Sequence, residues 1–196
     1  MKKERNEWIH SWQDENFKDD LPRVLLVGDS ITHNYQSYVR KMLKGVCYVD
    51  YVATSFAIDT AIYFDLIKDY AEYNRYDLIH FNNGLHGIHI SKNSYKKRLK
   101  KMIEMLIKNS KVILVNSTVI YKQNNEVLDN SWMKRVKERT EAVDELSGEF
   151  NLNTDDLFSV SCNIPKDMRY KDGTHYKQNG YIKLAEQVAK IIRENL

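Results

Sequence analysis

Short apolar runs separated by longer segments of helical spacing constrain the fold of this 196-residue chain more than any other feature. The runs are rich in β-branched side chains, which is typical of strands buried on both faces of a parallel sheet. They lie at Val24–Val27, Val46–Val52, Leu78–Phe81 and Val112–Val115, and a fifth short strand is expected near Asn151–Asp155.

The segments between these runs have the 3.6-residue period of amphipathic helices. In one of them, Tyr95, Leu99 and Met102 share a face. Helices are expected at Tyr35–Lys44, Thr60–Tyr73, Ser94–Lys108, from Asn130 to a C-cap at Gly148, and at Gly180–Glu194. Alternating strands and helices imply a parallel sheet with helices on both faces. The sequence therefore predicts an α/β fold, a three-layer α/β/α sandwich around a central, mainly parallel five-stranded sheet.

The chain shows no internal repeat and no low-complexity linker, so we expect a single domain over residues 21–196. Residues 1–20 are expected to form an N-terminal extension that packs on this body. Within it, Glu7–Gln13 is predicted to form an extra helix, with Trp8 and Trp12 packed against the domain.

The charge and the hydrophobic pattern of the chain limit the kinds of partner and location that we expect for it. A formal net charge of +3 is too weak to indicate a nucleic-acid partner, which usually needs a concentrated basic face. No stretch approaches the roughly 20 apolar residues of a membrane span. The charged first residues lack the apolar region of a signal peptide, so we expect a cytoplasmic protein, or a secreted one if a leader has been removed. Neither an NAD-type nor a P-loop phosphate motif is present, so no cofactor is expected.

The first candidate site follows the first strand, where Gly28-Asp29-Ser30-Ile31 leads into a helix. Glycine permits a tight turn at this point. Ser30 then lies near a helix N-terminus, where free backbone N–H groups stabilise an anion. These residues suit a nucleophilic serine, although Asp29 or Ser30 acting only as a helix cap explains the same pattern.

The second candidate site is Asp172-Gly173-Thr174-His175, just before the last helix. A serine hydroxyl becomes a good nucleophile when a histidine takes its proton and a carboxylate fixes the tautomer of that histidine. Asp172 and His175 are three residues apart and can meet on one side of a turn. One loop can therefore supply both groups, although a capping aspartate beside a surface histidine remains an alternative.

A third polar loop, Asn82-Asn83-Gly84-Leu85-His86-Gly87, follows the third strand and can supply hydrogen-bond donors to an oxyanion. Together the three segments resemble the SGNH hydrolases, or GDSL-type esterases and lipases. Gly28-Asp29-Ser30-Ile31 is similar to the family's first block, and Asp172 with His175 is similar to its last.

The resemblance implies a flavodoxin-like SGNH fold and a serine-dependent hydrolase of short acyl esters, including O-acetyl groups on carbohydrate. It implies that Ser30 is the nucleophile, His175 the general base and Asp172 its orienting group, with no metal. The chain departs from the family pattern at two oxyanion positions. Ile58 stands where the family has glycine, and His86 stands where it has asparagine, so Asn82 or Asn83 is an alternative donor to His86.

Asp29, His33 and Gly84 are the remaining candidates for substrate contact, although a packing role for His33 is an alternative. A metal site at His80, His86 and His89 is not expected, because acidic partners and metal-binding spacing are missing. Two other functions stay open. One is an acyltransferase that uses the same triad, and the other is a non-catalytic carbohydrate-binding protein, which the two departures favour.

Overall fold

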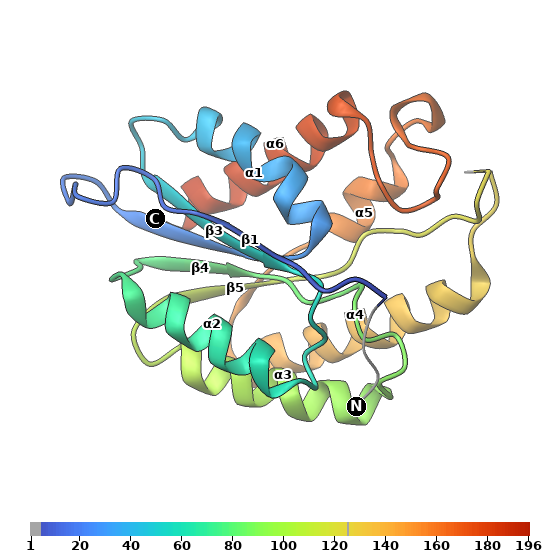
Figure 1. The fold of residues 1–196 in the computed structure, drawn as a ribbon, viewed down its shortest axis with the longest axis horizontal. Helices are drawn as coiled ribbons and strands as arrows, with labels where there is room; N and C mark the ends of the chain where they lie inside the picture. The colour runs from blue at the N-terminus through green and yellow to red at the C-terminus, as the bar shows by residue number, and fades with distance from the viewer. Residues whose placement is uncertain (1–4, 125) are drawn as a thin grey trace.

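The computed structural model describes residues 5–124 and 126–196, so the first four residues of the expected N-terminal extension lie outside the described residues. A six-stranded sheet runs through the middle of the molecule, in the order β1-β3-β2-β4-β5-β6 (Figure 1). All neighbouring pairs are parallel except β1 and β3. The strands are β1 (Ile9–Trp12), β2 (Arg23–Gly28), β3 (Tyr48–Thr54), β4 (Leu78–Phe81), β5 (Lys111–Val115) and β6 (Asn153–Asp155).

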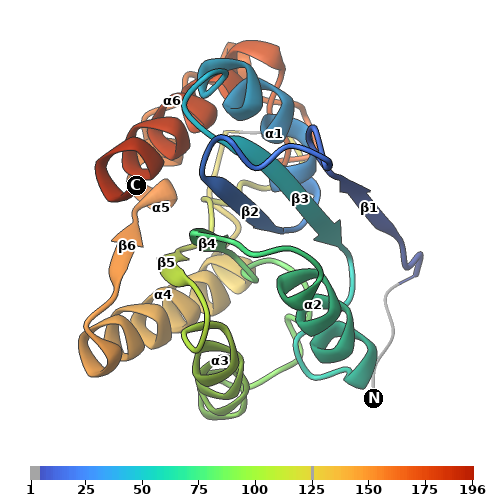
Figure 2. The same ribbon diagram turned by 90° about the vertical axis from the view of Figure 1, so that its left-hand side faces the viewer.

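Helices cover both faces of the sheet, as Figures 1 and 2 show. On one face lie α1 (Ser30–Met42), α5 (Leu157–Cys162) and α6 (Gln178–Asn195), and on the other lie α2 (Ala61–Tyr73), α3 (Lys92–Leu106) and α4 (Asn130–Phe150). A short 3₁₀ turn, η1, spans Lys166–Met168. Across residues 5–124 and 126–196, no helix combines the length and the apolar character needed to cross a membrane.

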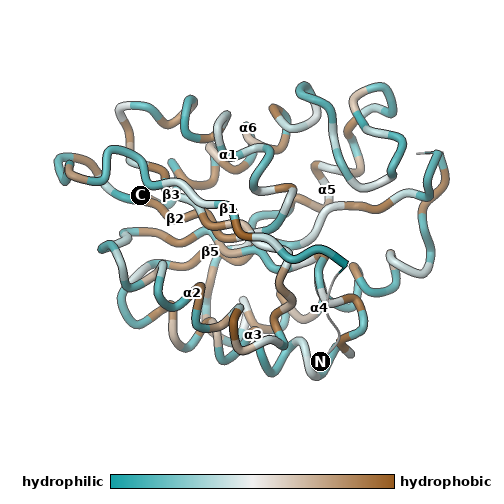
Figure 3. Tube along the Cα trace, viewed as in Figure 1, coloured by the Kyte–Doolittle hydropathy of each residue, from teal (hydrophilic) through white to brown (hydrophobic). Residues whose placement is uncertain are grey.

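The two hydrophobic cores lie on opposite sides of the sheet because successive strand residues point in opposite directions. On β2, Val24 and Leu26 pack with α1 and α6, whereas Leu25 and Val27 pack with α2, α3 and α4. All of β2 is buried, which explains its unbroken apolar sequence. In Figure 3 the hydrophobic colour accordingly concentrates along the central strands. The predicted three-layer α/β/α architecture is confirmed.

The strand count and the N-terminal helix need correction, because the sheet has six strands instead of five. Residues Glu7–Gln13 do not form a helix, since Ile9–Trp12 is the edge strand β1, antiparallel to β3. The four-residue spacing of Trp8 and Trp12 fits a helix, but the open edge of β3 offers backbone donors and acceptors. Pairing with that edge satisfies the backbone of β1 and outweighs the local pattern.

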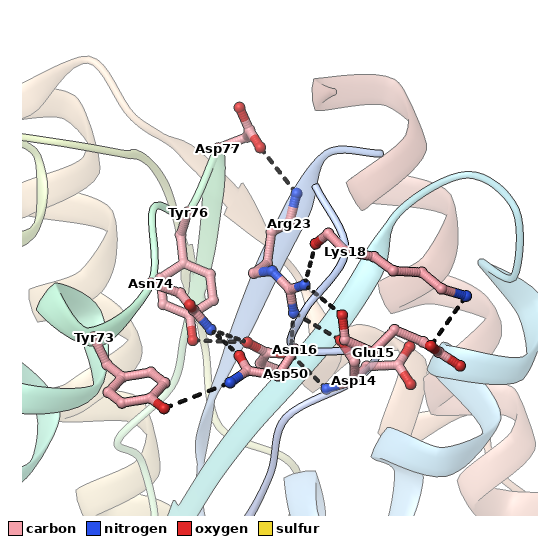
Figure 4. A network of polar contacts seen from close by, with 10 residues as sticks. All are labelled: Asp14, Glu15, Asn16, Lys18, Arg23, Asp50, Tyr73, Asn74, Tyr76 and Asp77. Atoms are coloured by element: carbon pink, nitrogen blue, oxygen red, sulfur yellow. Dashed lines mark hydrogen bonds and ion pairs between the residues drawn. The ribbon is translucent and has the colours of Figure 1, made fainter. Parts of the chain in front are cut away.

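A buried polar network holds the segment that connects β1 to β2 (Figure 4). The guanidinium of Arg23 donates to Asp50 at 2.9 Å and to the main-chain carbonyls of Asp14, Glu15 and Lys18 at 2.8, 3.2 and 2.9 Å. Asp50 also accepts from the backbone N–H of Asp14 at 2.8 Å. The extension is therefore fixed to the sheet by charge-assisted hydrogen bonds as well as by β pairing.

Candidate active site

The candidate site lies at the carboxyl end of β2, where the order of the strands in the sheet reverses relative to their order in the chain. Strand β2 lies between β3 and β4, the next two strands of the chain, so these two strands are added on opposite sides of it. In open α/β sheets such a switch point leaves a crevice at the carboxyl ends of the strands, where ligands bind. Ser30 follows β2 directly at this edge, and the loops after β3 and β4 adjoin it.

Ser30 is the first residue of α1, and its neighbours fix the start of that helix. The carboxylate of Asp29 accepts from the N–H of Ile31 at 2.8 Å and caps the helix. Asp29 is only 4% exposed, so its carboxylate stabilises the start of the helix and is not placed for the expected substrate contact. Gly28 does not form the tight turn expected of it but ends β2. A side chain there would meet Thr32, whose Oγ1 lies 2.0 Å from the position of a Cβ.

The loop before α6 brings His175 and Asp172 to Ser30. His175 Nε2 lies 3.0 Å from Ser30 Oγ, and His175 Nδ1 lies 2.8 Å from Asp172 Oδ2. The two ring nitrogens therefore join the hydroxyl to the carboxylate across 145 residues of sequence. The three residues singled out in the sequence come together in the order that a serine, a base and an orienting carboxylate require.

Asp172 also organises its own loop. Its Oδ1 accepts from the backbone N–H groups of Thr174 and His175, both at 2.9 Å. Partial burial opposes ionisation, but these N–H groups and the His175 ring outweigh it and hold the pKa of Asp172 below its ordinary value. The group beside the imidazole is therefore a carboxylate at neutral pH, which suits it to accept the Nδ1 proton and stabilise an imidazolium.

Gly173 is required in this loop by its backbone and by its surroundings. Its φ is +81°, in the region that side chains disfavour, and a Cβ would lie 2.1 Å from the carbonyl oxygen of Tyr121. The Gly173 carbonyl accepts from the Tyr121 N–H at 2.8 Å, which fixes the loop to the segment after β5. This contact fixes the loop that carries Asp172 and His175, and in this loop the His175 ring lies within hydrogen-bond distance of Ser30.

Two backbone N–H groups at the site have no hydrogen-bond partner among the described residues, those of Ser30 and Ile58. Both follow the carboxyl ends of adjacent parallel strands, β2 and β3. Ile58 is buried and has no positive φ, so its backbone needs no glycine. Isoleucine at this position, where the resemblance leads us to expect glycine, therefore retains a donor in an ordinary backbone conformation.

Two of the candidate donors after β4, Asn82 and Asn83, differ in what holds them. The Asn82 amide donates to the carbonyls of Val115 and Asn116 at 3.3 and 3.1 Å, and its oxygen accepts from the Gly84 N–H at 3.1 Å. Asn82 and the buried Gly84 are therefore engaged with the backbone. The side-chain amide of Asn83, by contrast, is not tied to a main-chain carbonyl in the described part of the chain, and its Oδ1 is buried there without a partner. These contacts favour Asn83 over Asn82 as a donor.

Arg139 of α4 is a site residue that the sequence reasoning missed. It is 2% exposed and donates to the main-chain carbonyls of Gly84, His86 and Gly87, the last two at 2.8 and 2.6 Å. The arginine therefore sets the path of the loop that carries Asn83 and His86. A signal was present, because Arg139 interrupts the apolar stripe of its helix between Val136 and Val143.

The histidines considered for a metal have separate partners. His80 is fully buried and pairs with Asp155 at 2.9 Å, whereas His89 pairs with Asp59 at 3.1 Å. The pairing of His89 with Asp59 links the loop after β4 to the loop after β3. Within residues 5–124 and 126–196, no cluster of three or more His, Cys, Asp or Glu side chains is arranged to hold a metal ion.

The surroundings of the triad are open on one side. A cavity of about 540 Å³ is lined by Asp172, His175, Asn34, Tyr38, Tyr170 and Tyr181. The side chains of His175 and Asp172 are 36% and 50% exposed. Water therefore has access to the imidazole from this side.

His33, the remaining candidate for substrate contact, lies one turn after Ser30 on α1. Its Nδ1 is 3.2 Å from the Tyr51 hydroxyl, and its ring stacks on that of His10 at 4.3 Å between centroids. Burial and the neighbouring His10 lower the pKa of His33, which favours its neutral form. His33 therefore lies one helical turn from the serine, and its ring packs with those of His10 and Tyr51.

Comparison with known proteins identifies the fold. No protein-family model matches the chain, and no curated protein sequence matches it significantly. Among solved structures, it is similar to Axe2, an acetylxylan esterase from Geobacillus stearothermophilus, with a TM-score of 0.71 and 15% identity over 89% of this chain and 94% of that one. It is also similar to the lipase/acylhydrolase from Enterococcus faecalis, with a TM-score of 0.66 and 19% identity over 89% and 97% of the two chains. The chain therefore has the fold of the GDSL-type esterases and acylhydrolases.

Proposed function

We propose that this protein is a serine-dependent carboxylic ester hydrolase that acts on short acyl esters, with acetyl groups on carbohydrate as the preferred class. The observation that carries this proposal is the hydrogen-bonded series from Ser30 through His175 to Asp172, with distances of 3.0 and 2.8 Å. The likeness of the fold to an acetylxylan esterase supports the choice of acyl group and alcohol.

In the proposed first step, the Ser30 hydroxyl attacks the ester carbonyl while its proton passes to His175 Nε2. Asp172 accepts the Nδ1 hydrogen bond and stabilises the imidazolium. The tetrahedral oxyanion receives hydrogen bonds from the Ser30 and Ile58 N–H groups and from Asn83 or His86. The intermediate then expels the alcohol, which takes its proton from His175, and leaves an acyl group on Ser30.

In the second step, His175 takes a proton from water as the water attacks the acyl-enzyme. Collapse of that intermediate releases the carboxylic acid and returns the proton to Ser30. The exposure of the imidazole supports water as the acceptor and therefore favours hydrolysis over acyl transfer. Two features argue against a non-catalytic carbohydrate-binding role: the Ser30 and Ile58 N–H groups, which have no partner among residues 5–124 and 126–196, and the hydrogen-bonded series from Ser30 to Asp172.

The test compares wild type with Ser30→Ala on 4-nitrophenyl acetate, with circular dichroism to verify that both proteins are folded. We expect wild type to release nitrophenol and the variant to lose at least about 10³-fold in kcat. A serine-reactive phosphonate should label Ser30. Equal rates for the two proteins, or labelling of a different residue, would overturn the assignment. Product analysis with a sugar alcohol present separates hydrolysis from transfer.

A further inference from the structure

Four aromatic side chains form a group at the site, and of these the proposed chemical steps use only His86, as an alternative oxyanion donor to Asn83. We name Trp8, His10, His33 and His86 the ring cluster. The Trp8 ring lies 5.0 Å from that of His10, 6.4 Å from that of His33 and 6.3 Å from that of His86, which it meets edge to face. His10 and His33 are stacked at 4.3 Å. The cluster joins the N-terminal extension to two elements of the candidate active site.

Strand register places this cluster at the catalytic edge of the sheet. His10 pairs with Ala53, and Ala53 pairs with Gly28, two residues before Ser30. Because β1 is antiparallel to β3, the chain preceding His10 extends further toward the carboxyl edge. His33 follows Ser30 by one helical turn, and His86 belongs to the loop that Arg139 holds. Trp8 is therefore surrounded by groups that flank the nucleophile.

The backbone of Trp8 is fixed, so the indole is positioned by the sheet. Its N–H donates to Ser55 Oγ at 2.9 Å, and its carbonyl accepts from Thr54 Oγ1 at 2.8 Å and from the Ser55 N–H at 3.2 Å. A ring held on a rigid backbone loses little conformational entropy when a ligand packs on it. This arrangement is what a preformed binding surface requires.

The chemistry of the cluster indicates its ligand. Trp8 is only partly buried and His10 is exposed, so these rings are not sealed in the core. The indole offers a broad apolar face, and the imidazoles around it add nitrogen donors and acceptors. A sugar ring has the matching pattern, with apolar C–H groups on its face and hydroxyls at its rim. A long acyl chain requires a continuous apolar wall, which the three imidazoles interrupt.

We propose that the ring cluster binds the pyranose ring that carries the ester, with Trp8 as the stacking platform and the histidines at its hydroxyl rim. This inference rests on the proposed function, because it assigns the alcohol part of the substrate to that site. It makes the N-terminal extension part of the binding site as well as an edge of the sheet.

The test compares an acetylated xylo-oligosaccharide with 4-nitrophenyl acetate, which lacks a sugar. We expect Trp8→Ala to lose about tenfold more kcat/KM on the sugar ester than on the aryl ester, mainly through KM, and Trp8→Phe to recover most of the loss. Trp12→Ala is the matched control. Trp12 ends strand β1, which Trp8 directly precedes, and lies away from the carboxyl edge with its ring against Arg40 at 4.9 Å. Its removal should leave the ratio of the two rates unchanged.

Equal losses on both esters in a folded Trp8→Ala protein would overturn the sugar platform, as would a loss that grows with acyl chain length on aryl esters. Binding of unacetylated xylo-oligosaccharide to Ser30→Ala, measured by calorimetry, provides a readout that needs no catalysis. We expect this binding to weaken when Trp8→Ala is added to Ser30→Ala. If wild type cleaves neither ester, the proposed function fails, and the calorimetry alone decides for or against the platform.

Discussion

Substitution of Arg139 tests whether the loop after β4 is held in a conformation that supports catalysis. Arg139→Met retains the length and the apolar part of the side chain but removes three donors to the carbonyls of Gly84, His86 and Gly87. It also removes the cation that lies 4.8 Å from the Tyr95 ring centroid. The loop that carries Asn83 would lose its main polar anchor.

The magnitude follows from two opposing effects. A hydrogen bond that involves a charged group contributes about 1.5–3 kcal/mol to stability, and three are lost here. Methionine also removes the cost of burying the guanidinium, a cost reflected in the way burial lowers the pKa of Arg139. We therefore expect the free energy of unfolding to fall by about 2–4 kcal/mol. If the loop moves and one oxyanion donor is displaced, kcat should fall on the order of 10²-fold.

The assay pairs urea unfolding with kcat and KM for 4-nitrophenyl acetate, measured at urea concentrations where the variant is fully folded. Arg135→Met is the control, because Arg135 lies one turn earlier on α4 and pairs with Glu138 at the surface. Its loss should cost at most about 1 kcal/mol and leave kcat unchanged. A folded Arg139→Met protein with wild-type kcat would refute the idea that this arginine positions the oxyanion donors. Arg139→Lys should recover part of both losses, since one ammonium cannot reach all three carbonyls.

Three further substitutions test the fold and the loop before α6. Asp50→Ala should lower the free energy of unfolding by about 3–5 kcal/mol in urea, because a buried guanidinium loses its counter-ion; a loss below about 1 kcal/mol would contradict the buried pair. The carboxylate of Asp172 stabilises the fold above its unfolded pKa of about 3.9 and loses this effect as the pH falls toward its lower folded pKa. The difference in unfolding free energy between wild type and Asp172→Asn should therefore be largest at neutral pH and narrow in acid; a difference independent of pH would exclude this linkage. Gly173→Ala should reduce both kcat and the free energy of unfolding. The control is Gly45→Ala, because Gly45 has nearly the same φ of +80° but no atom within 4 Å of its Cβ position, and it should cost only about 1–2 kcal/mol of backbone strain. Equal effects of the two substitutions would show that the Tyr121 contact is unimportant.

The layered architecture was predictable from the sequence because each parallel strand is buried on two faces. The fully apolar run at β2 can be accommodated in few other ways, and its flanking helices carry matching apolar stripes. Helix ends were less predictable. Gly148 was expected to end α4, but the helix continues to Phe150 and ends at Asn151, whose φ is +52°. Asparagine tolerates this conformation, and the local sequence does not show which of the two residues adopts it.

The edge strand could not be predicted for a different reason. The sequence of β1 has no apolar face, and all four of its residues are exposed. Its conformation depends on β3, which lies about 40 residues further along the chain. The ring cluster was hidden with it, since the stacking of His10 on His33 exists only once β1 pairs. Residues considered separately in the sequence, together with His10, became a candidate binding surface through a tertiary contact.

The proposed triad and the proposed oxyanion donors also differ in how far sequence can reveal them. In the proposed reaction, Ser30, Asp172 and His175 would act through side chains whose chemical identity that reaction requires, so their residue types and loop positions were informative. Oxyanion donors are partly backbone N–H groups, which every residue except proline carries. Ile58 therefore looks like a defect when it replaces a glycine, yet a position without positive φ gains nothing from glycine. The property that matters there is an N–H in the loop after β3 with no partner in the described part of the chain, and that depends on the fold. By the same reasoning, Ile58→Gly should leave kcat near wild type, and a large gain in kcat would show that the isoleucine had impaired the oxyanion site.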